Sequence, residues 1–347
     1  MAEPLLEVSD LKIHFFTDEG VVKAVDGVDL TIERGKTLCL VGESGCGKSV
    51  TSRAFLQIIR KPGKVVSGQM LWHRQRDGKA DEIIDLAKLD PKGELIRQIR
   101  GDEIAMIFQE PMTSLSLMHT IGDQITEMIR LHTNATKQEA RERGIEMLQR
   151  VGIPRPERLI DEYPFRLSGG MRQRAMIAMA LSCSPKLLIA DEPTTALDVT
   201  TQAQILDLML QLQSDYGMAL LFITHDLGIV AEIADEVAVM YLGRIVERSD
   251  VYTVFNEPKH PYTQALLRSI PKIAMRRDDL EPIKGMVPSP FRRPSGCHFH
   301  PRCGQRFDLC NQLEPVNTQV GENHEVRCLL YEDVSARTLD SKVVSHG

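Results

Sequence analysis

Three continuous apolar runs mark the centre of the predicted fold. Thr37–Val41, Leu187–Ala190 and Ala219–Ile223 show no alternation of polar and apolar positions, which is typical of strands covered on both faces in a parallel sheet. Between residues 5 and 32 the apolar stretches are short, rich in β-branched residues and interrupted by a polar turn, so this part predicts antiparallel strands. Together these patterns predict an α/β fold.

Helical spacing characterises the middle of the chain. Apolar residues such as Ile125, Met128 and Ile129 recur three or four positions apart, which predicts a helical insertion. From about Asn256 the composition shifts toward Pro, Arg, Cys and His. We therefore expect a core at residues 1–108 and 168–255, a helical insertion at 109–167, and a separate, loop-rich C-terminal domain at 256–347.

A glycine-rich loop follows the first apolar run, with the sequence Gly42-Glu43-Ser44-Gly45-Cys46-Gly47-Lys48-Ser49, and the residues after it predict a helix to about Arg60. In such a strand, loop and helix unit the glycines let backbone N–H groups surround a polyphosphate at the positive end of the helix. We expect Lys48 to reach the β- and γ-phosphates and Ser49 to ligate Mg²⁺. A chance glycine-rich turn is the alternative, and the strand and helix context argues against it.

An acidic pair follows the second apolar run. Asp191 ends that predicted strand, where a carboxylate can hold Mg²⁺ through water, and Glu192 is expected to orient or activate the attacking water. Such a pair can also simply cap a helix. The continuation Pro193-Thr194-Thr195-Ala196-Leu197-Asp198 favours the catalytic interpretation, and Asp198 is a further candidate nucleotide contact.

A second glycine-rich element, Leu167-Ser168-Gly169-Gly170-Met171, opens an apolar helix. Ser168 and the two glycines after it form an anion site at a helix start, although the chain's own ATP already has one. We infer that Ser168, Gly169 and Gly170 contact the ATP of a second molecule. A simple capped helix start is the alternative.

These motifs together resemble the ATPase subunits of ATP-binding cassette (ABC) transporters. The resemblance implies a P-loop NTPase fold: a RecA-like core with an antiparallel β subdomain, and two ATPase domains facing head to tail. It also implies that Gln109 senses Mg²⁺ and the attacking water, and that His225 touches the γ-phosphate. An aromatic ring of the early sheet stacks on adenine in this family; we favour Phe15 over Phe16, and a core role is the alternative for either ring.

Two C-terminal segments narrow the resemblance to the dipeptide, oligopeptide and nickel importer branch: His260-Pro261-Tyr262-Thr263-Gln264-Ala265-Leu266-Leu267 and Gly296-Cys297-His298-Phe299-His300-Pro301-Arg302-Cys303. The segment from Phe108 to Leu115 agrees with it. The branch implies an ATPase subunit that powers import of di- or oligopeptides, with nickel or another small solute as the alternative. Its implied partners are a second ATPase subunit, forming a heterodimer rather than a homodimer, two transmembrane permease subunits and an extracytoplasmic solute-binding protein.

Four cysteines lie close together in the C-terminal part: Cys297, Cys303, Cys310 and Cys328. Their spacing matches neither a zinc ribbon nor a bacterial ferredoxin, so the residues alone leave zinc and [4Fe–4S] comparable. The family resemblance favours the [4Fe–4S] cluster; zinc and free or reversibly oxidised thiols remain alternatives. We expect His298, His300 and His324 to be exposed loop residues rather than ligands. The distance in sequence from the phosphate loop suggests a structural or assembly role for the cysteines.

Composition limits the remaining possibilities. The 347 residues carry a net charge of −6 with both signs interspersed, which argues against a nucleic-acid partner. No export signal is evident, and no apolar run reaches the roughly 18–20 residues that span a bilayer, so we expect a peripheral protein at the cytoplasmic face of the membrane. A soluble ABC ATPase acting on ribosomes or DNA, and a redox- or iron-responsive regulator, are the alternatives from other classes.

Overall fold

The computed structural model describes residues 3–75, 81–109, 114–195, 197–270 and 283–334. Part of the segment after Gln109, at 110–113, lies outside these residues, as do Ala196 and both ends of the predicted domains at 1–2 and 335–347. The strands are β1 (Pro4–Thr17), β2 (Gly20–Glu33), β3 (Thr37–Val41), β4 (Gly63–Arg74), β5 (Glu82–Asp85), β6 (Ile104–Ile107), β7 (Leu187–Asp191), β8 (Ala219–Thr224), β9 (Glu236–Tyr241), β10 (Arg244–Asp250), β11 (Thr318–Gly321) and β12 (His324–Val326). The α-helices are α1 (Lys48–Phe55), α2 (Glu94–Ile99), α4 (Ile121–His132), α5 (Lys137–Arg150), α6 (Pro156–Leu159), α7 (Gly169–Leu181), α8 (Val199–Tyr216), α9 (Leu227–Ile233), α10 (Val251–Asn256) and α11 (Pro261–Arg268).

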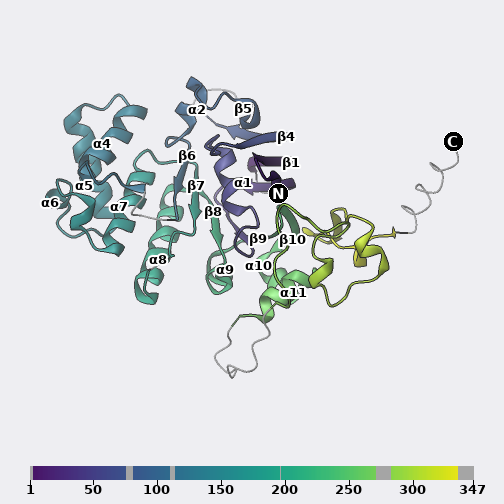
Figure 1. The fold of residues 1–347 in the computed structure, drawn as a ribbon. Coiled ribbons are helices and arrows are strands. Elements are labelled where there is room, and N and C mark those ends of the chain that lie inside the picture. The colour runs from purple at the N-terminus through teal and green to yellow at the C-terminus, as the bar shows by residue number, and fades with distance from the viewer. Residues whose placement is uncertain (1–2, 76–80, 110–113, 196, 271–282, 335–347) are drawn as a thin grey trace.

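Two sheets organise these elements (Figure 1). The first is antiparallel with strand order β2-β1-β4-β5, and the second has the order β11-β12-β10-β9-β3-β8-β7-β6. Strands β9, β3, β8, β7 and β6 run parallel to one another. The predicted α/β class, with an antiparallel sheet beside a mainly parallel one, is confirmed.

The parallel strands are buried on both faces, as their continuous apolar sequences predict. In β3, Leu38 and Leu40 pack into a core shared with the antiparallel sheet and α1, whereas Cys39 and Val41 pack into a core shared with helices α4, α5, α7, α8 and α9. Successive side chains of a strand point to opposite faces. The sheet therefore separates two apolar cores, and the loops that follow its strands lie at its edge between these cores.

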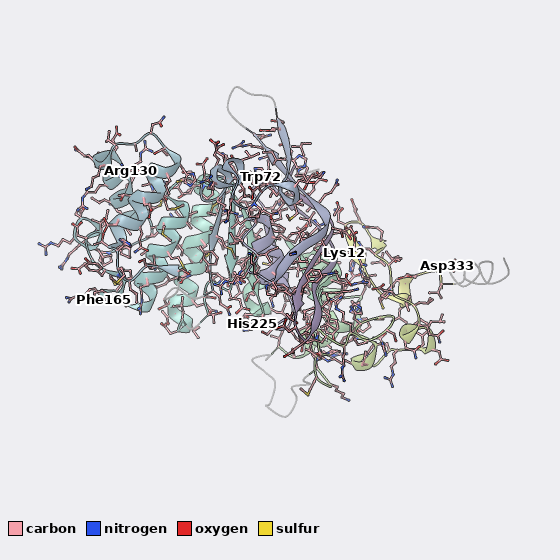
Figure 2. The ribbon with its side chains drawn as sticks, turned by 45° about the horizontal axis from the view of Figure 1, so that its top comes forward. Lys12, Trp72, Arg130, Phe165, His225 and Asp333 are labelled. Carbon is pink, nitrogen blue, oxygen red and sulfur yellow. The ribbon has the colours of Figure 1, made fainter. Side chains whose placement is uncertain are left out.

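The helical region lies at one end of the molecule and the C-terminal region at the other. Figure 2 shows Arg130 and Phe165 far from Asp333. Helices α4 and α5 begin with capping boxes at Thr120 and Thr136, which satisfy the first free N–H groups of each helix. None of the helices in the described part of the chain is long and apolar enough to cross a membrane.

Two features differ from the sequence-based expectation. Helix α1 ends at Phe55 rather than near Arg60, and Gln57 has a positive φ of 52° that helical backbone does not allow. The C-terminal region is loop-rich, but it is not separate from the core. Strand β12 pairs with β10, where Glu247 lies opposite Val326, and so covers an edge that would otherwise expose unpaired backbone groups.

Candidate nucleotide site

The loop between β3 and α1 has a backbone that only glycine accommodates at two positions. Gly42 has φ 149°, and a Cβ there would lie 2.2 Å from the carbonyl oxygen of Met240. Gly47 has φ 109°, and its Cβ would lie 2.4 Å from the carbonyl oxygen of Ala24. Left-handed φ values and these close approaches exclude any side chain. The predicted strand, glycine-rich loop and helix are therefore present in the required order.

Lys48 lies inside this loop. Its side chain is buried, and its Nζ donates hydrogen bonds to the carbonyl oxygens of Gly42 at 2.7 Å and Glu43 at 3.2 Å. These contacts hold a positive charge at the N-terminal end of α1, where an anion is already favoured by the helix dipole. The arrangement is suited to a polyphosphate.

Ser49 and Asp191 meet across the sheet end. The Ser49 hydroxyl donates to Oδ1 of Asp191 at 2.7 Å. Asp191 is fully buried, and its Oδ2 accepts no hydrogen bond from any described residue, although Nη2 of Arg53 lies 3.7 Å away. Burial raises the pKa of Asp191, and the Ser49 hydrogen bond opposes that rise. A buried carboxylate oxygen beside a hydroxyl is a donor set that fits Mg²⁺.

Gln109, Glu192 and His225 come together at the carboxyl ends of β6, β7 and β8. Nε2 of Gln109 donates to Oε2 of Glu192 at 2.9 Å, and Nδ1 of His225 lies 3.4 Å from Oε1 of the same carboxylate. Thr195 also donates to Oε2 at 3.2 Å. Parallel strands place the residues that follow them at one edge of the sheet, which explains this convergence. The three predicted residues thus form one cluster around a carboxylate.

The backbone fixes the position of Glu192. Its φ of 48° is left-handed, which is uncommon for a residue other than glycine. Its N–H donates to the carbonyl oxygen of Ile223 at 2.9 Å. A cleft of about 800 Å³ opens beside the cluster, lined by Gly42, Glu43 and Ser44 of the loop as well as by the three cluster side chains. The carboxylate therefore faces the same space as the phosphate loop.

The second glycine-rich element begins α7, as predicted. Ser168 is the N-cap residue of this helix, and its Oγ accepts from the N–H of Met171 at 3.3 Å. A Cβ on Gly170 would meet Thr201 of α8 at 2.9 Å, whereas no described atom lies within 4 Å of a Cβ on Gly169. Gly170 therefore has a packing role, while Gly169 leaves open space. A contact with the ATP of a second molecule remains a prediction.

Asp198 has a local role in the structure. It is the N-cap residue of α8 and accepts from the N–H of Thr201 at 3.0 Å and from its hydroxyl at 2.7 Å. These hydrogen bonds lower the pKa of Asp198. Its predicted nucleotide contact is additional to this capping and stays a prediction.

The two candidate aromatic rings differ in exposure. Phe15 is partly buried and packs against the core beneath the antiparallel sheet, close to Gly63. Phe16 is 47% exposed, with Nζ of Lys64 5.9 Å from its ring centroid. Adenine stacking needs an accessible ring face. The preference for Phe15 remains a prediction, and Phe16 is the more accessible ring.

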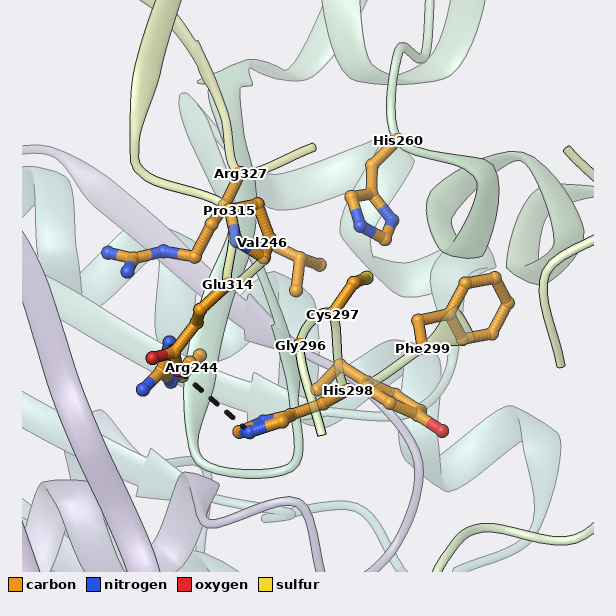
Figure 3. A pocket seen from close by; sticks show the side chains of 11 residues that line it. Arg244, Val246, His260, Gly296, Cys297, His298, Phe299, Glu314, Pro315 and Arg327 are labelled. Carbon is orange, nitrogen blue, oxygen red and sulfur yellow. Dashed lines mark ion pairs between the residues drawn. The ribbon is translucent and has the colours of Figure 1, made fainter. Parts of the chain in front are cut away.

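None of the four C-terminal cysteines forms a disulfide in the part of the chain that the structure describes. Burial raises the pKa of Cys297 to about 11 and that of Cys328 to about 12, and the neighbouring cysteines add to both shifts. Figure 3 shows Cys297 beside a small pocket that His260 and Phe299 also line. Within the described ranges, no group of three or more His, Cys, Asp and Glu residues is placed to hold a metal ion. The predicted cluster is thus without direct support from the side-chain positions.

The expectation that the nearby histidines are exposed is wrong for His324 and His298. His324 is buried because β12 adds to the sheet, and its Nε2 lies 2.8 Å from Oε1 of Glu247. His298 has a side chain only 12% exposed, and its Nε2 lies 4.0 Å from Oε1 of Glu314; Figure 3 marks this contact. Burial lowers the pKa of His298 to about 4. His300 is half-buried.

Two contacts to the phosphate loop were missed by the sequence reasoning. Arg302 forms a paired interaction with the carboxylate of Glu43, and the backbone N–H of Glu43 donates to Oη of Tyr262 at 3.0 Å. Both partners come from the two C-terminal segments that carried the family resemblance. No local pattern links them to a loop more than two hundred residues earlier.

Comparison with family profiles identifies two regions. Residues 25–195 match the family described as ABC transporter, and residues 246–310 match the family described as oligopeptide/dipeptide transporter, C-terminal region. The second match begins in β10 and ends at Cys310. It thus includes both segments that contact the phosphate loop.

Curated relatives match the chain over nearly its whole length. A putative peptide import ATP-binding protein of Brucella ovis is 50% identical, covering 96% of this chain and 99% of the relative. The oligopeptide transport ATP-binding protein AppD of Bacillus subtilis is 50% identical, with 96% and 98% covered. The dipeptide transport ATP-binding protein DppD of Escherichia coli is 45% identical, with 93% and 96% covered.

Solved structures share the fold. A dimeric ATP-binding cassette in a post-hydrolysis state bound to ADP and phosphate superposes with a TM-score of 0.60 at 24% identity, covering 71% of this chain and 98% of that one. CbiO1 of Clostridium perfringens, part of an ABC transporter complex, has a TM-score of 0.59 at 29% identity, with 74% and 92% covered. The chain therefore belongs to the ABC transporter family of ATP-binding subunits, in the group that carries the oligopeptide/dipeptide transporter C-terminal region.

Proposed function

We propose that this chain binds ATP with Mg²⁺ at the phosphate loop and hydrolyses it to power the import of di- or oligopeptides. The observation that carries the proposal is the contact of Gln109 and His225 with the Glu192 carboxylate, beside the loop that holds Lys48. The names of the relatives, which are peptide import and dipeptide transport subunits, support the substrate class.

The hydrolytic step relies on placement. Glu192 accepts a hydrogen bond from the attacking water, takes its proton and directs the water oxygen toward the γ-phosphate. Gln109 and Thr195 hold the Glu192 carboxylate in position. His225 sits on the solvent side of Glu192 and completes the contact with the γ-phosphate. Ser49 and Asp191 would hold Mg²⁺, which supplies charge neutralisation between the phosphates. Phe15 is our proposed partner for adenine.

The transport step requires a second ATPase subunit. In this proposal Ser168, Gly169 and Gly170 face the ATP of that subunit, and Asp198 lies at the same interface. Closure of the pair on ATP moves the helical insertion at residues 109–167 against two transmembrane permease subunits. Because ATP contacts both ATPase subunits only when the pair is closed, its binding energy shifts the population toward the closed pair.

This cycle implies a location and a set of partners for the chain. The chain is a peripheral subunit at the cytoplasmic face of the membrane, it pairs as a heterodimer, and it receives solute from an extracytoplasmic binding protein through the permeases. Residues 1–108 and 168–255 form the ATPase core and residues 256–347 the C-terminal domain, which is joined to the core through β12.

We further propose that Cys297, Cys303, Cys310 and Cys328 bind one [4Fe–4S] cluster, with zinc as the competing metal. Hydrogen bonds to sulfur support thiolate chemistry there: the N–H of Gln305 donates to Sγ of Cys303 at 3.4 Å, and backbone groups of Phe299 and Leu330 hydrogen-bond to Cys297 and Cys328 and lower their pKa. Burial and the neighbouring thiols raise the same pKa values, so a bound metal would have to stabilise the thiolates. Hydrogen bonds to sulfur tune such clusters. Ligation requires the four side chains to turn toward a common centre.

Peptide uptake into vesicles tests the proposed function. The chain is assembled with its permease subunits in vesicles so that the ATPase side faces the lumen, which contains ATP. A radiolabelled dipeptide and its binding protein are added outside. Uptake should require ATP and fail with Lys48→Ala. Uptake of nickel but not of dipeptide would overturn the substrate class, and ATP-independent uptake would overturn the energetic role.

A further inference from the structure

Glu43 of the phosphate loop is held by the C-terminal region through its side chain. Nη1 and Nη2 of Arg302 donate to its two carboxylate oxygens at 2.7 and 3.0 Å. The Arg302 side chain is only 4% exposed, and its Nε donates to the carbonyl oxygen of Lys284 at 3.2 Å. Two parallel hydrogen bonds between a guanidinium and a carboxylate fix orientation as well as distance. Arg302 thus holds the Glu43 side chain from a buried position.

The backbone of Glu43 is held at the same time. Its N–H donates to Oη of Tyr262 at 3.0 Å, and its carbonyl oxygen accepts from Nζ of Lys48 at 3.2 Å. Tyr262 is fully buried in α11. A single residue of the loop therefore connects the C-terminal region to the lysine that would meet the phosphates.

An aromatic cluster supports both contacts. Tyr241, at the end of β9, packs against Tyr262 with ring centroids 4.6 Å apart and against Phe299 at 5.3 Å. The guanidinium of Arg302 lies 5.9 Å from the Tyr241 ring and 6.0 Å from the Phe299 ring. Such packing limits the rotamers of the side chains involved. Arg302 and Tyr262 consequently approach the loop from rigid surroundings.

We propose that Arg302 and Tyr262 are positioning residues of the phosphate loop, which set its affinity for MgATP by fixing Glu43. The inference rests on the proposed ATP site and adds C-terminal residues to it. Arg302 ends the short 3-10 helix His300–Arg302 between Cys297 and Cys303, so this part of the cysteine site lies against the phosphate loop despite the separation in sequence. Neither residue touches the reacting atoms; both act through the loop backbone and Lys48.

The expected effect is on ATP affinity more than on turnover. Removing Arg302 leaves the Glu43 carboxylate, whose side chain is 26% exposed, without the paired hydrogen bonds that orient it. The phosphate loop then loses its fixed shape, and we expect a fall of at least about tenfold in ATP affinity. The loop holds the phosphates in the ground state and in the transition state alike. Losing the contacts that position the loop should therefore raise KM and change kcat by less than about threefold. A change in overall folding would not separate KM from kcat in this way.

The test measures KM and kcat for MgATP in the complex assembled with the permease subunits. Arg302→Ala and Tyr262→Phe should raise KM, while Arg292→Ala, an exposed arginine of the same region, should leave it unchanged. Because Arg302 acts through Glu43, the double variant of Arg302→Ala with Glu43→Gln should be no worse than Arg302→Ala alone.

Three results would overturn the inference: a wild-type KM for Arg302→Ala, an equal rise for Arg292→Ala, or fully additive effects in the double variant. Lys48→Ala separates this failure from that of the proposed function. If Lys48→Ala binds ATP normally, the ATP site itself is misplaced. If Lys48→Ala loses ATP while Arg302→Ala retains it, only the positioning role is refuted.

Discussion

Glu247 joins the C-terminal region to the core through one buried carboxylate. It lies on β10 with its side chain fully buried. Its Oε1 accepts from the N–H of Lys259 at 2.6 Å and faces Nε2 of His324 at 2.8 Å, and its Oε2 accepts from the N–H of His260 at 2.9 Å. One carboxylate thereby joins β10, the start of α11 and β12.

We expect Glu247→Ala to lower the free energy of unfolding by about 3–5 kcal/mol. Each buried donor left without an acceptor costs about 1–3 kcal/mol. The N–H of His260 and Nε2 of His324 are buried, whereas the N–H of Lys259 is part-buried, which puts the expected total toward the lower end of the sum. Chemical denaturation of the chain measures the change. Glu247→Gln, which keeps one acceptor oxygen, should lose less.

Glu257→Ala is the matched control. Its side chain is 68% exposed and lies 3.7 Å from Nζ of Lys259, so its removal should cost less than about 1 kcal/mol. If Glu247→Ala destabilises the chain no more than Glu257→Ala does, the three hydrogen bonds of Glu247 carry no net stability.

Three further predictions concern pH, the interface and the cysteines. Burial lowers the pKa of His260 to about 3, so the unfolded chain binds one more proton than the folded chain between about pH 3 and 6.5. The free energy of unfolding should therefore fall as pH is lowered through this window, and His260→Asn, which keeps an acceptor for the N–H of Tyr262, should flatten the slope; an unchanged slope in denaturation curves counts against it. Gly169→Asp should spare ATP binding by the isolated chain but stop hydrolysis by the complex, since a carboxylate would repel a γ-phosphate held by the proposed second ATPase subunit; a binding loss equal to that of Lys48→Ala contradicts this. Anaerobically purified protein should contain about four irons per chain and lose them in Cys303→Ser, and stoichiometric zinc without iron would exclude the cluster.

Much of the fold could be predicted from sequence because its signals are local. Continuous apolar runs identified the buried parallel strands, and the glycine pattern before Lys48 identified the phosphate loop. The family resemblance supplied the expected roles of Gln109 and His225, and their convergence on Glu192 follows from the neighbouring parallel strands β6, β7 and β8. These features depend on neighbouring residues or on the order of motifs along the chain.

The missed features depend on contacts between distant segments. Strand β12 spans only His324–Val326 and contains a histidine and a glutamate, so it has no recognisable strand pattern before it pairs with β10. The Arg302 and Glu43 pair joins residues 259 positions apart. Sequence periodicity does not predict a contact between such distant residues. The burial of His324 and His298 likewise results from tertiary packing.

The role of Glu192 is tested most directly by the rate of ATP hydrolysis in the assembled complex carrying Glu192→Gln. The amide oxygen can replace Oε2 and still accept from Gln109 and Thr195, so the site should keep its shape and its ATP affinity. Loss of the general base should lower kcat by about 10²–10⁴-fold. Unchanged ATP binding with this loss of turnover is the predicted result; hydrolysis at the wild-type rate would contradict the account.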